Sequence, residues 1–295
     1  MVLRRASHAG SWYNGTKESL KKQLSELFTN KDFGPGEEPS TLNLDKRTMI
    51  GGVSPHAGVE YSGSCAAFTY SNLFKERIPE TVIILGTDHV GYGKVALFGE
   101  GEWETPFGNL QIDSELSQEI LNKSNIIVED SAAFLGFMQQ EHNIEIQLPF
   151  IKYCANGKDV KIVTIKMGGR RDYNVFEKIA LAISSAINIL DRDVVLIASS
   201  DMSHKNVLNI DQLTEFKKID QDVVGAFVDL DPQKTFAAAS KTTVCGAQTI
   251  TTLMLTCKKL GANRGKLLKY YTSSDIRGGY GYCVGYFSGI MIKGS

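Results

Sequence analysis

The sequence predicts a single α/β domain over residues 1–295, with a central mixed, mostly parallel sheet flanked by helices. The first observation is that short apolar, β-branched runs alternate along the chain with segments of helical periodicity. The second is the length of 295 residues, which is enough for one large domain or two modest ones. The third is a composition of 42% hydrophobic and 22% charged residues, which is typical of a globular protein. Because no internal repeat is visible, one domain is favoured.

The first half of the chain predicts helix, loop, strand, helix and strand in turn. Between residues 16 and 30, apolar side chains recur at the spacing of one helical face: Leu20, Leu24, Leu27 and Phe28. Residues 30–47 are polar and contain glycine and proline, which predicts a surface loop. The patterns that follow predict a strand at 48–54, a helix near 63–74, a strand at 81–85 and a hairpin between 95 and 112.

The second half continues the alternation. A helical stretch covers 144–154, and it is followed by a strand at 160–166, a helix at 176–190 and a strand at 194–200. The last third predicts three helices, at about 220–229, 231–240 and 247–260, and then two strands, at 267–272 and 282–293. This order is typical of a sheet with helices on both of its faces.

Charge and cysteine content exclude several classes of function. Lys and Arg number 32 and Asp and Glu 33, a formal charge of −1, and no dense basic block offers a surface for nucleic acid or for a membrane. No apolar run reaches the length of a membrane span, and no signal-like segment follows the N-terminus. The five cysteines form no C-x-x-C pair and are expected to be reduced. The protein is therefore expected in the cytoplasm, which is also compatible with a presence in the nucleus.

Three of the five histidines follow shortly after predicted strands, namely His56, His89 and His204. In open α/β sheets, ligands bind in the crevice at the carboxyl ends of the strands, because loops from several strands meet there. These imidazoles are therefore expected to converge although they lie far apart in the sequence. Taken singly, each has the alternative interpretation of a hydrogen-bonded structural histidine.

Cys245 is a fourth candidate, because it stands just before the predicted helix at 247–260. A helix N-terminus favours the thiolate, which is the form that binds metal ions. Two imidazoles and a thiolate suit Fe(II) or copper, and zinc is also compatible with this donor set. Of the other cysteines, Cys65, Cys257 and Cys283 are expected to pack in the core.

Carboxylates accompany the histidines. Asp88 precedes His89, and Asp201 stands three residues before His204, so that both carboxylates are available to orient an imidazole or to bind a ligand. His142 lies between Glu141 and Asn143, and Glu145 follows at the start of a helical stretch. These residues are expected to orient the ligands or to contact a substrate, whereas His8, in an N-terminal loop, either contributes to the site or ties down the terminus.

Several common catalytic motifs are missing from the sequence. It contains no G-x-x-x-x-G-K-[ST] loop, no complete G-x-G-x-x-G after a strand, no H-E-x-x-H and no G-x-S-x-G. The residues that nucleotide-driven, zincin-type and α/β-hydrolase mechanisms require are therefore absent from the sequence. A metal site of another type or an acid/base site remains as the candidate functional site.

Seven short motifs together resemble the Memo family, named for a mediator of receptor-kinase-driven cell motility. They are Ser7-His8-Ala9-Gly10-Ser11-Trp12-Tyr13, Pro55-His56-Ala57-Gly58, Gly63-Ser64-Cys65-Ala66-Ala67, Leu85-Gly86-Thr87-Asp88-His89, Glu141-His142-Asn143-Ile144-Glu145, Ser199-Ser200-Asp201-Met202-Ser203-His204 and Cys245-Gly246. The resemblance runs from about residue 7 to the C-terminus. It implies a fold similar to that of the class III extradiol dioxygenases, which are non-haem iron enzymes.

The resemblance also implies roles for individual residues. His56, His89 and Cys245 would be the metal ligands, and His204 and His142 would match the acid/base and pocket histidines of the dioxygenases. We place Asp201 with these two as a catalytic group. His8, Asp88 and Glu145 are the expected substrate contacts.

Three functions are compatible with these residues. The favoured one is a metal-binding redox or dioxygenase-like protein that uses iron or copper. The second is a non-catalytic binding module that takes a phosphotyrosine peptide or a small anion in the same pocket, with His8, His142 and His204 facing the phosphate. The third is a structural protein, zinc-stabilised or metal-free, in which the histidines are hydrogen-bonded core residues.

Overall fold

The main sheet of this computed structural model, which describes residues 2–169 and 172–294, has four parallel strands at its centre. These are β2 (Met49–Ser54), β9 (Val194–Ser199), β3 (Thr81–Thr87) and β8 (Lys161–Met167), in that spatial order. The outer strands are β4 (Val95–Leu97), β7 (Val128–Glu129), β10 (His204–Val207), β11 (Ala262–Thr272) and β12 (Gly281–Lys293). β12 lies antiparallel to β2, and β4 lies antiparallel to β8. The predicted mixed sheet of a single α/β domain is therefore confirmed.

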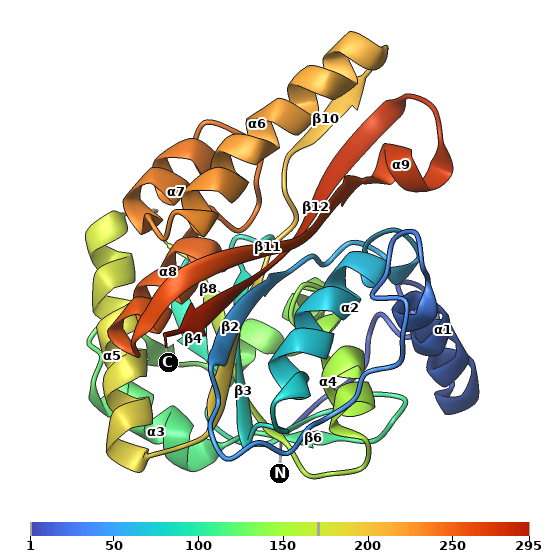
Figure 1. The fold of residues 1–295 in the computed structure, drawn as a ribbon. Helices are drawn as coiled ribbons and strands as arrows, with labels where there is room; N and C mark the ends of the chain where they lie inside the picture. The colour runs from blue at the N-terminus through green and yellow to red at the C-terminus, as the bar shows by residue number, and fades with distance from the viewer. Residues whose placement is uncertain (1, 170–171, 295) are drawn as a thin grey trace.

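Helices cover both faces of this sheet (Figure 1). They are α1 (Lys17–Thr29), α2 (Val59–Lys75), α3 (Ser114–Asn122), α4 (Gln147–Ala155), α5 (Tyr173–Leu190), α6 (Ile210–Val228), α7 (Pro232–Ala239), α8 (Ala247–Lys259) and α9 (Ser273–Arg277), with 3₁₀ turns at Ser131–Phe134 and Gly136–Gln140. α1, α2 and α4 lie on one side of the sheet, and α3, α5 and α8 lie on the other. None of the helices in the described ranges is long and apolar enough to cross a membrane.

Alternating side chains of the central strands explain this arrangement. In β3, Ile83 and Leu85 join the apolar cluster that contains residues of α5 and α8, whereas Val82 and Ile84 join the cluster that contains residues of α1, α2 and α4. Successive side chains of a strand point to opposite faces, so a strand that is apolar throughout must be covered on both sides. The two cores thereby hold the carboxyl ends of the parallel strands at one rigid edge.

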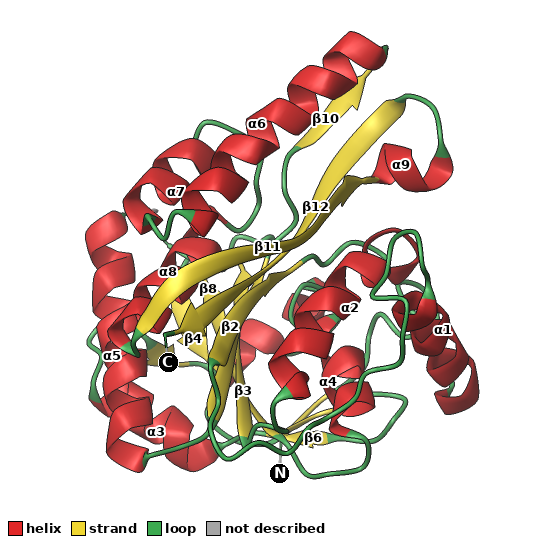
Figure 2. Cartoon of the chain, in the orientation of Figure 1, coloured by secondary structure: helices red, strands yellow, loops and turns green. Residues whose placement is uncertain are grey.

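Several elements differ from the sequence prediction. α6 begins at Ile210, ten residues before the predicted start at 220, and Asn209 caps it by accepting a hydrogen bond from the Gln212 amide at 2.9 Å. The predicted hairpin at 95–112 exists as β5 (Glu102–Trp103) and β6 (Leu110–Gln111), which form a small sheet with β1 (Leu3–Arg4). The first piece of that segment, β4, pairs instead with the main sheet. Figure 2 shows the β11–β12 ribbon continuing beyond the central strands toward β10 and α9.

Gly86, in β3, allows the segment that carries His142 to pack closely on the sheet. A Cβ atom at this position would run into the side chains of Asn143 and Ile144, closer than side chains are found to approach. We expect Gly86→Ala to lower the free energy of unfolding by about 1–3 kcal/mol, as overpacking does. Gly225→Ala is the control, because Gly225 lies inside α6 with open space at its Cβ position, and it should stabilise the protein by about 0.5–1 kcal/mol. Equal denaturant midpoints for the two variants would contradict the prediction.

Candidate metal centre

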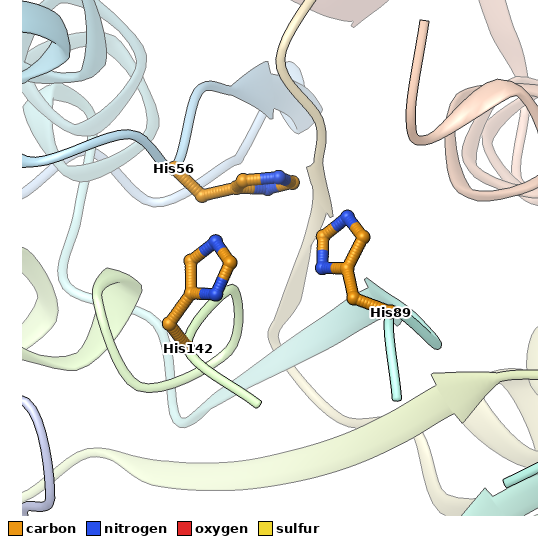
Figure 3. A group of neighbouring side chains, drawn as sticks. All are labelled: His56, His89 and His142. Atoms are coloured by element: carbon orange, nitrogen blue, oxygen red, sulfur yellow. The ribbon is translucent and has the colours of Figure 1, made fainter. Parts of the chain in front are cut away.

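Three imidazoles meet at the carboxyl edge of the sheet (Figure 3). His56 follows β2, His89 follows β3 and His142 precedes α4, and each offers a ligand atom within 4.8 Å of the other two. The edge position follows from the parallel strands, whose carboxyl ends lie together. The convergence of His56 and His89 agrees with the sequence analysis. His142, which the resemblance placed as a pocket histidine, lies inside the same cluster.

Cys245 borders this cluster. Its Sγ lies 3.2 Å from His56 Nε2 and accepts a hydrogen bond from the Asp201 backbone amide at 3.2 Å. Gly246 makes this approach of the α8 N-terminus to β9 feasible, because a Cβ at position 246 would collide with Ser200 and Thr249. The structure therefore brings together all three residues predicted as metal ligands, with His142 as a further nitrogen donor.

His56 is held in the tautomer that binds metal through Nε2. Its Nδ1 lies 2.9 Å from Ser199 Oγ, and that hydroxyl donates its proton to the Asn143 carbonyl oxygen at 2.7 Å. Since Ser199 has only one proton to donate, the Nδ1 of His56 must be the donor in the bond between them. Burial lowers the pKa of His56 well below its ordinary value, so the ring is neutral and its Nε2 lone pair faces Cys245.

His89 is oriented by a carboxylate. Glu141 accepts hydrogen bonds from the His89 backbone amide at 2.7 Å and from His89 Nδ1 at 2.9 Å, which leaves Nε2 for the cluster. Burial opposes protonation of the ring, but hydrogen bonds with Cys245 and Glu141 outweigh it and raise the pKa of His89 to about 10. The side chain is 30% exposed. A metal ion bound at Nε2 therefore has to displace a proton to solvent.

His142 is held by stacking. Its ring lies 4.1 Å from the Trp12 ring, and 5.2 Å from the nearly parallel ring of His89, measured between centroids. Burial and the charge of nearby His89 lower the pKa of His142 to about 4, so the ring is neutral. Within the described residues, neither of its ring nitrogens takes part in a hydrogen bond. A neutral imidazole with free nitrogens is suited to bind a metal or to accept a hydrogen bond.

Asp201 acts on the cluster through the backbone. Its Oδ1 accepts hydrogen bonds from the backbone amides of His56 at 2.7 Å and Ala57 at 3.3 Å, while its Oδ2 lies 3.9 Å from His204 Nε2. Burial raises the pKa of Asp201. His204 stands at the start of β10, where its backbone amide donates a hydrogen bond to Thr243 Oγ1 at 2.6 Å. Two of the three predicted catalytic residues, Asp201 and His204, therefore lie near the predicted metal ligands, although their side chains form no direct hydrogen bond with each other.

Glu145 anchors the N-terminal segment. The fully buried carboxylate forms an ion pair with Arg4, whose Nη1 lies 2.8 Å from Oε2, and it lies 3.0 Å from His8 Nδ1. It also accepts a hydrogen bond from the Tyr13 hydroxyl at 2.8 Å. Because its oxygens are occupied within the protein, the predicted contact of Glu145 with a substrate could only be indirect, through His8. Asp88 lines another cavity, and its Oδ2 accepts a hydrogen bond from the Gly93 backbone amide at 2.8 Å.

Sequence reasoning missed two supporting residues. Ser199 orients His56, and Trp12 holds His142. Ser199 is the last residue of β9 and the next-to-last residue of the strand predicted at 194–200, so its position at a strand end already pointed to the site. Trp12 lies in one of the family-like motifs, but nothing local in the sequence shows that its ring would reach a histidine 130 positions away.

Comparisons with known proteins agree with the motifs. The Memo-like protein family matches residues 4–290. MEMO1 family proteins of Methanobrevibacter smithii and Methanopyrus kandleri are 36% and 35% identical to this chain, over 98% and 97% of it and over 100% and 98% of their own lengths. The MEMO1 family protein PF1638 of Pyrococcus furiosus is 36% identical over 99% of the chain and 100% of its own length.

A solved structure supports the fold alone. The uncharacterized protein JW3007 from Escherichia coli K12 superposes with a TM-score of 0.51 at 10% identity, covering 83% of this chain and 100% of its own. The motif order, the α/β fold and the full-length relatives lead to one assignment: this chain belongs to the Memo-like, or MEMO1, protein family.

Proposed function

We propose that the protein is a metal-dependent redox protein of the dioxygenase-like type, which binds iron or copper through His56, His89 and Cys245. The observation that carries the proposal is the convergence of His56 and His89, whose ligand atoms lie within 4.8 Å of each other and of His142. Ser199 and Glu141 bond the Nδ1 atoms of His56 and His89, which leaves both Nε2 atoms directed to one place.

The donor set fits iron, copper or zinc better than magnesium or calcium. Imidazole nitrogens and a thiolate are borderline to soft ligands, whereas Mg²⁺ and Ca²⁺ prefer oxygen. Cys245 Sγ lies beside His56 Nε2 and accepts a hydrogen bond from the Asp201 backbone amide. A bound iron or copper ion would supply redox and Lewis-acid chemistry.

The surrounding residues supply proton transfer. His142 is neutral because its pKa is about 4, so any proton that its ring takes from an acidic hydroxyl of a substrate is held only transiently and is readily returned. His204, whose Nε2 lies 3.9 Å from Asp201 Oδ2, is available as a second proton carrier. His89 is 30% exposed, so a small molecule is able to approach the cluster from solvent.

Oxygen consumption tests this function. The full chain is loaded anaerobically with Fe(II) or Cu(I), mixed with a series of phenolic compounds, and followed with an oxygen electrode. We expect saturable oxygen uptake with at least one phenol, reduced about 10²- to 10⁴-fold in His142→Ala when that residue carries the proton. A loaded protein that shows neither oxygen uptake nor metal-centred redox cycling would refute the redox function.

The alternative function is a binding module for a phosphotyrosine peptide or a small anion. The rings of His8 and His142, 6.0 Å apart, are available to receive a phosphate. Calorimetry with a phosphotyrosine peptide and its unphosphorylated counterpart distinguishes the two functions. Phosphate-dependent heat in a protein without oxygen uptake would favour the module.

A further inference from the structure

A separate cavity of about 600 Å³ lies at the amino edge of the sheet, away from the metal centre. Its walls come from the first turns of α1, the loop at 38–43, the C-terminal end of α4, and the residues Ile78 and Phe107. His142 precedes α4, whereas the cavity adjoins the opposite end of this helix, so the two sites do not overlap. The volume is in the range of cavities that hold small organic molecules.

Four lysines line this cavity, namely Lys17, Lys21, Lys152 and Lys158. In the described part of the chain, none of the four forms an ion pair with a carboxylate. Glu38 is the one carboxylate in the described lining, and its two oxygens accept hydrogen bonds from the hydroxyls of Tyr153 and Ser25. The cavity therefore carries an excess of positive charge that its own walls do not neutralise.

Lys17 and Lys21 stand where helix α1 gains nothing from a cation. Lys17 is the first residue of α1, and the positive end of the helix dipole disfavours a cation there. Lys21 follows four positions later on the same face, where two like charges repel each other. By contrast, Lys22 forms an ion pair with Glu26 at 3.8 Å on another face of the helix. An anion in the cavity would compensate for both unfavourable terms.

The other two lysines also have a structural role. Lys152 lies in the last turn of α4, and Lys158 follows Asn156, the residue at which this helix ends. Cations are favoured at the C-terminus of a helix, and Lys152 also donates a hydrogen bond to the Asn109 carbonyl at 3.3 Å. Helix stability therefore accounts for this pair. It does not account for the two lysines of α1, which line the same cavity.

Phe107 gives the cavity an apolar surface beside the lysines. Its half-buried ring lies 6.3 Å from the ring of Tyr153, measured between centroids. Tyr153 stacks in turn on Phe28 of α1 at 5.4 Å, on the side of the sheet where Figure 1 shows α1 and α4. Ile78 and Pro39 extend this wall. One cavity thus offers both positive charge and apolar surface to a ligand.

We propose that this cavity binds a small organic phosphate, which carries two or more phosphate charges on an apolar or aromatic body. Ammonium groups bind phosphate oxygens as point charges, so several lysines match several phosphate groups. The described lining contains no arginine, the side chain whose planar fork recognises a single carboxylate through two bonds. A nucleoside triphosphate has the required charge, and its base would lie against Phe107. An inorganic phosphate chain would leave the apolar wall without a partner.

The phosphate site does not depend on the proposed redox function, because its lysines lie at the other end of α4. The proposal concerns binding alone, since the sequence lacks the G-x-x-x-x-G-K-[ST] loop of nucleotide-driven proteins. A neighbouring cavity of about 390 Å³ shares Lys158 with this one, but Asp45, Glu80 and Asp159 line it, so it is unsuited to an anion. The test uses the full chain freed of metal by a chelator that is then removed, so that a failure of metal binding leaves the result unaffected.

Calorimetry with ATP at low ionic strength and without Mg²⁺ tests the proposal. We expect saturable binding that weakens as salt is added, no measurable binding of adenosine, and binding of inorganic triphosphate at least about threefold weaker than that of ATP. The double variant Lys17→Gln/Lys21→Gln should weaken ATP binding at least about tenfold, because two charge-assisted bonds are lost. Lys22→Gln is the matched control: it removes an exposed lysine of the same helix outside the cavity lining, and it should change the affinity less than about twofold.

Several results would overturn the proposal. Without saturable ATP binding, the four side chains are solvated surface lysines and form no site. Equal weakening by Lys22→Gln would mean that ATP responds to the overall surface charge. Equal affinity for adenosine would contradict the role of the phosphates, and equal affinity for inorganic triphosphate would contradict the role of the apolar wall.

Two further arms exclude other locations and other ligands. ATP binding that is lost in His142→Ala and kept in the lysine variant would place the phosphates at the histidine cluster. Polyglutamate that binds more tightly than ATP would mean that the cavity receives an acidic segment of another protein. Because Lys17 and Lys21 are exposed, the double variant is expected to fold, and thermal unfolding of each variant checks this.

Discussion

Replacing His56 or His89 with alanine is expected to reduce bound metal from near-stoichiometric to background. Each change removes one of two imidazoles whose Nε2 atoms face the same point, and the loss of a protein ligand lowers the affinity for the ion. The measurement is elemental analysis of protein purified without chelator or affinity tag, in the presence of a reductant. His204→Ala is the control, since its ring is bonded at Thr243 and lies outside the histidine cluster, and it should keep its metal.

Cys245→Ser and His142→Ala identify the third ligand. Loss of metal in Cys245→Ser, together with loss of the thiolate-to-metal absorption of the copper-loaded protein, would assign Sγ as a ligand. Loss in His142→Ala alone would instead assign the histidine triad. Metal-free wild-type protein after anaerobic reconstitution would contradict the metal centre as a whole and favour the structural or peptide-binding alternatives.

The sheet and its strand-end residues were predictable because they depend on local pattern. Apolar runs such as Val82–Leu85 reveal a buried strand without any knowledge of its neighbours, and His56 and His89 follow such strands directly. β10 was not predicted, since its four residues, His204–Val207, are mainly polar and their pairing with β12 is a tertiary contact. The start of α6 was missed although the sequence indicates it, because Asn209 is a capping residue and Leu213 and Phe216 recur at helical spacing.

The supporting contacts of the site were not predictable from local pattern. The tautomer of His56 depends on Ser199, at the end of β9, and on Asn143 and Gln147, just before and at the start of α4, which are two segments far apart in the sequence. The resemblance to the Memo family placed His142 in the pocket, but only the packing of Trp12 and His89 against its ring shows that it is a neighbour of the predicted metal ligands. Hydrogen-bond networks between distant segments leave no periodic trace in a sequence.

Glu145→Gln is expected to lower the free energy of unfolding by about 3–5 kcal/mol, because it leaves the Arg4 guanidinium buried without its counter-charge. The side chains of Arg4 and Glu145 are 1% and 0% exposed. The measurement is chemical denaturation followed by circular dichroism. Arg5→Ala is the matched control: the neighbouring Arg5 pairs with Glu104 at 3.1 Å, but its side chain is 68% exposed, so its loss should cost at most about 1 kcal/mol.

The pH dependence of stability gives the same ion pair an independent test. Burial alone would raise the pKa of Glu145, but the hydrogen bond from His8 and the charge of Arg4 outweigh it and hold that pKa below its ordinary value. A carboxyl group with a depressed folded pKa contributes stability above its unfolded pKa, about 4.3, and that contribution is lost as the pH falls through the folded value. The loss of stability on acidification should therefore be smaller in Glu145→Gln than in the wild type. Parallel curves of stability against pH for the two proteins would mean that the ion pair makes no net contribution to stability.

A double variant, Arg4→Met/Glu145→Leu, separates the two causes of destabilisation. If it is more stable than Glu145→Gln, the loss of stability in Glu145→Gln comes from the unpaired charge of Arg4, since the double variant removes both charges together.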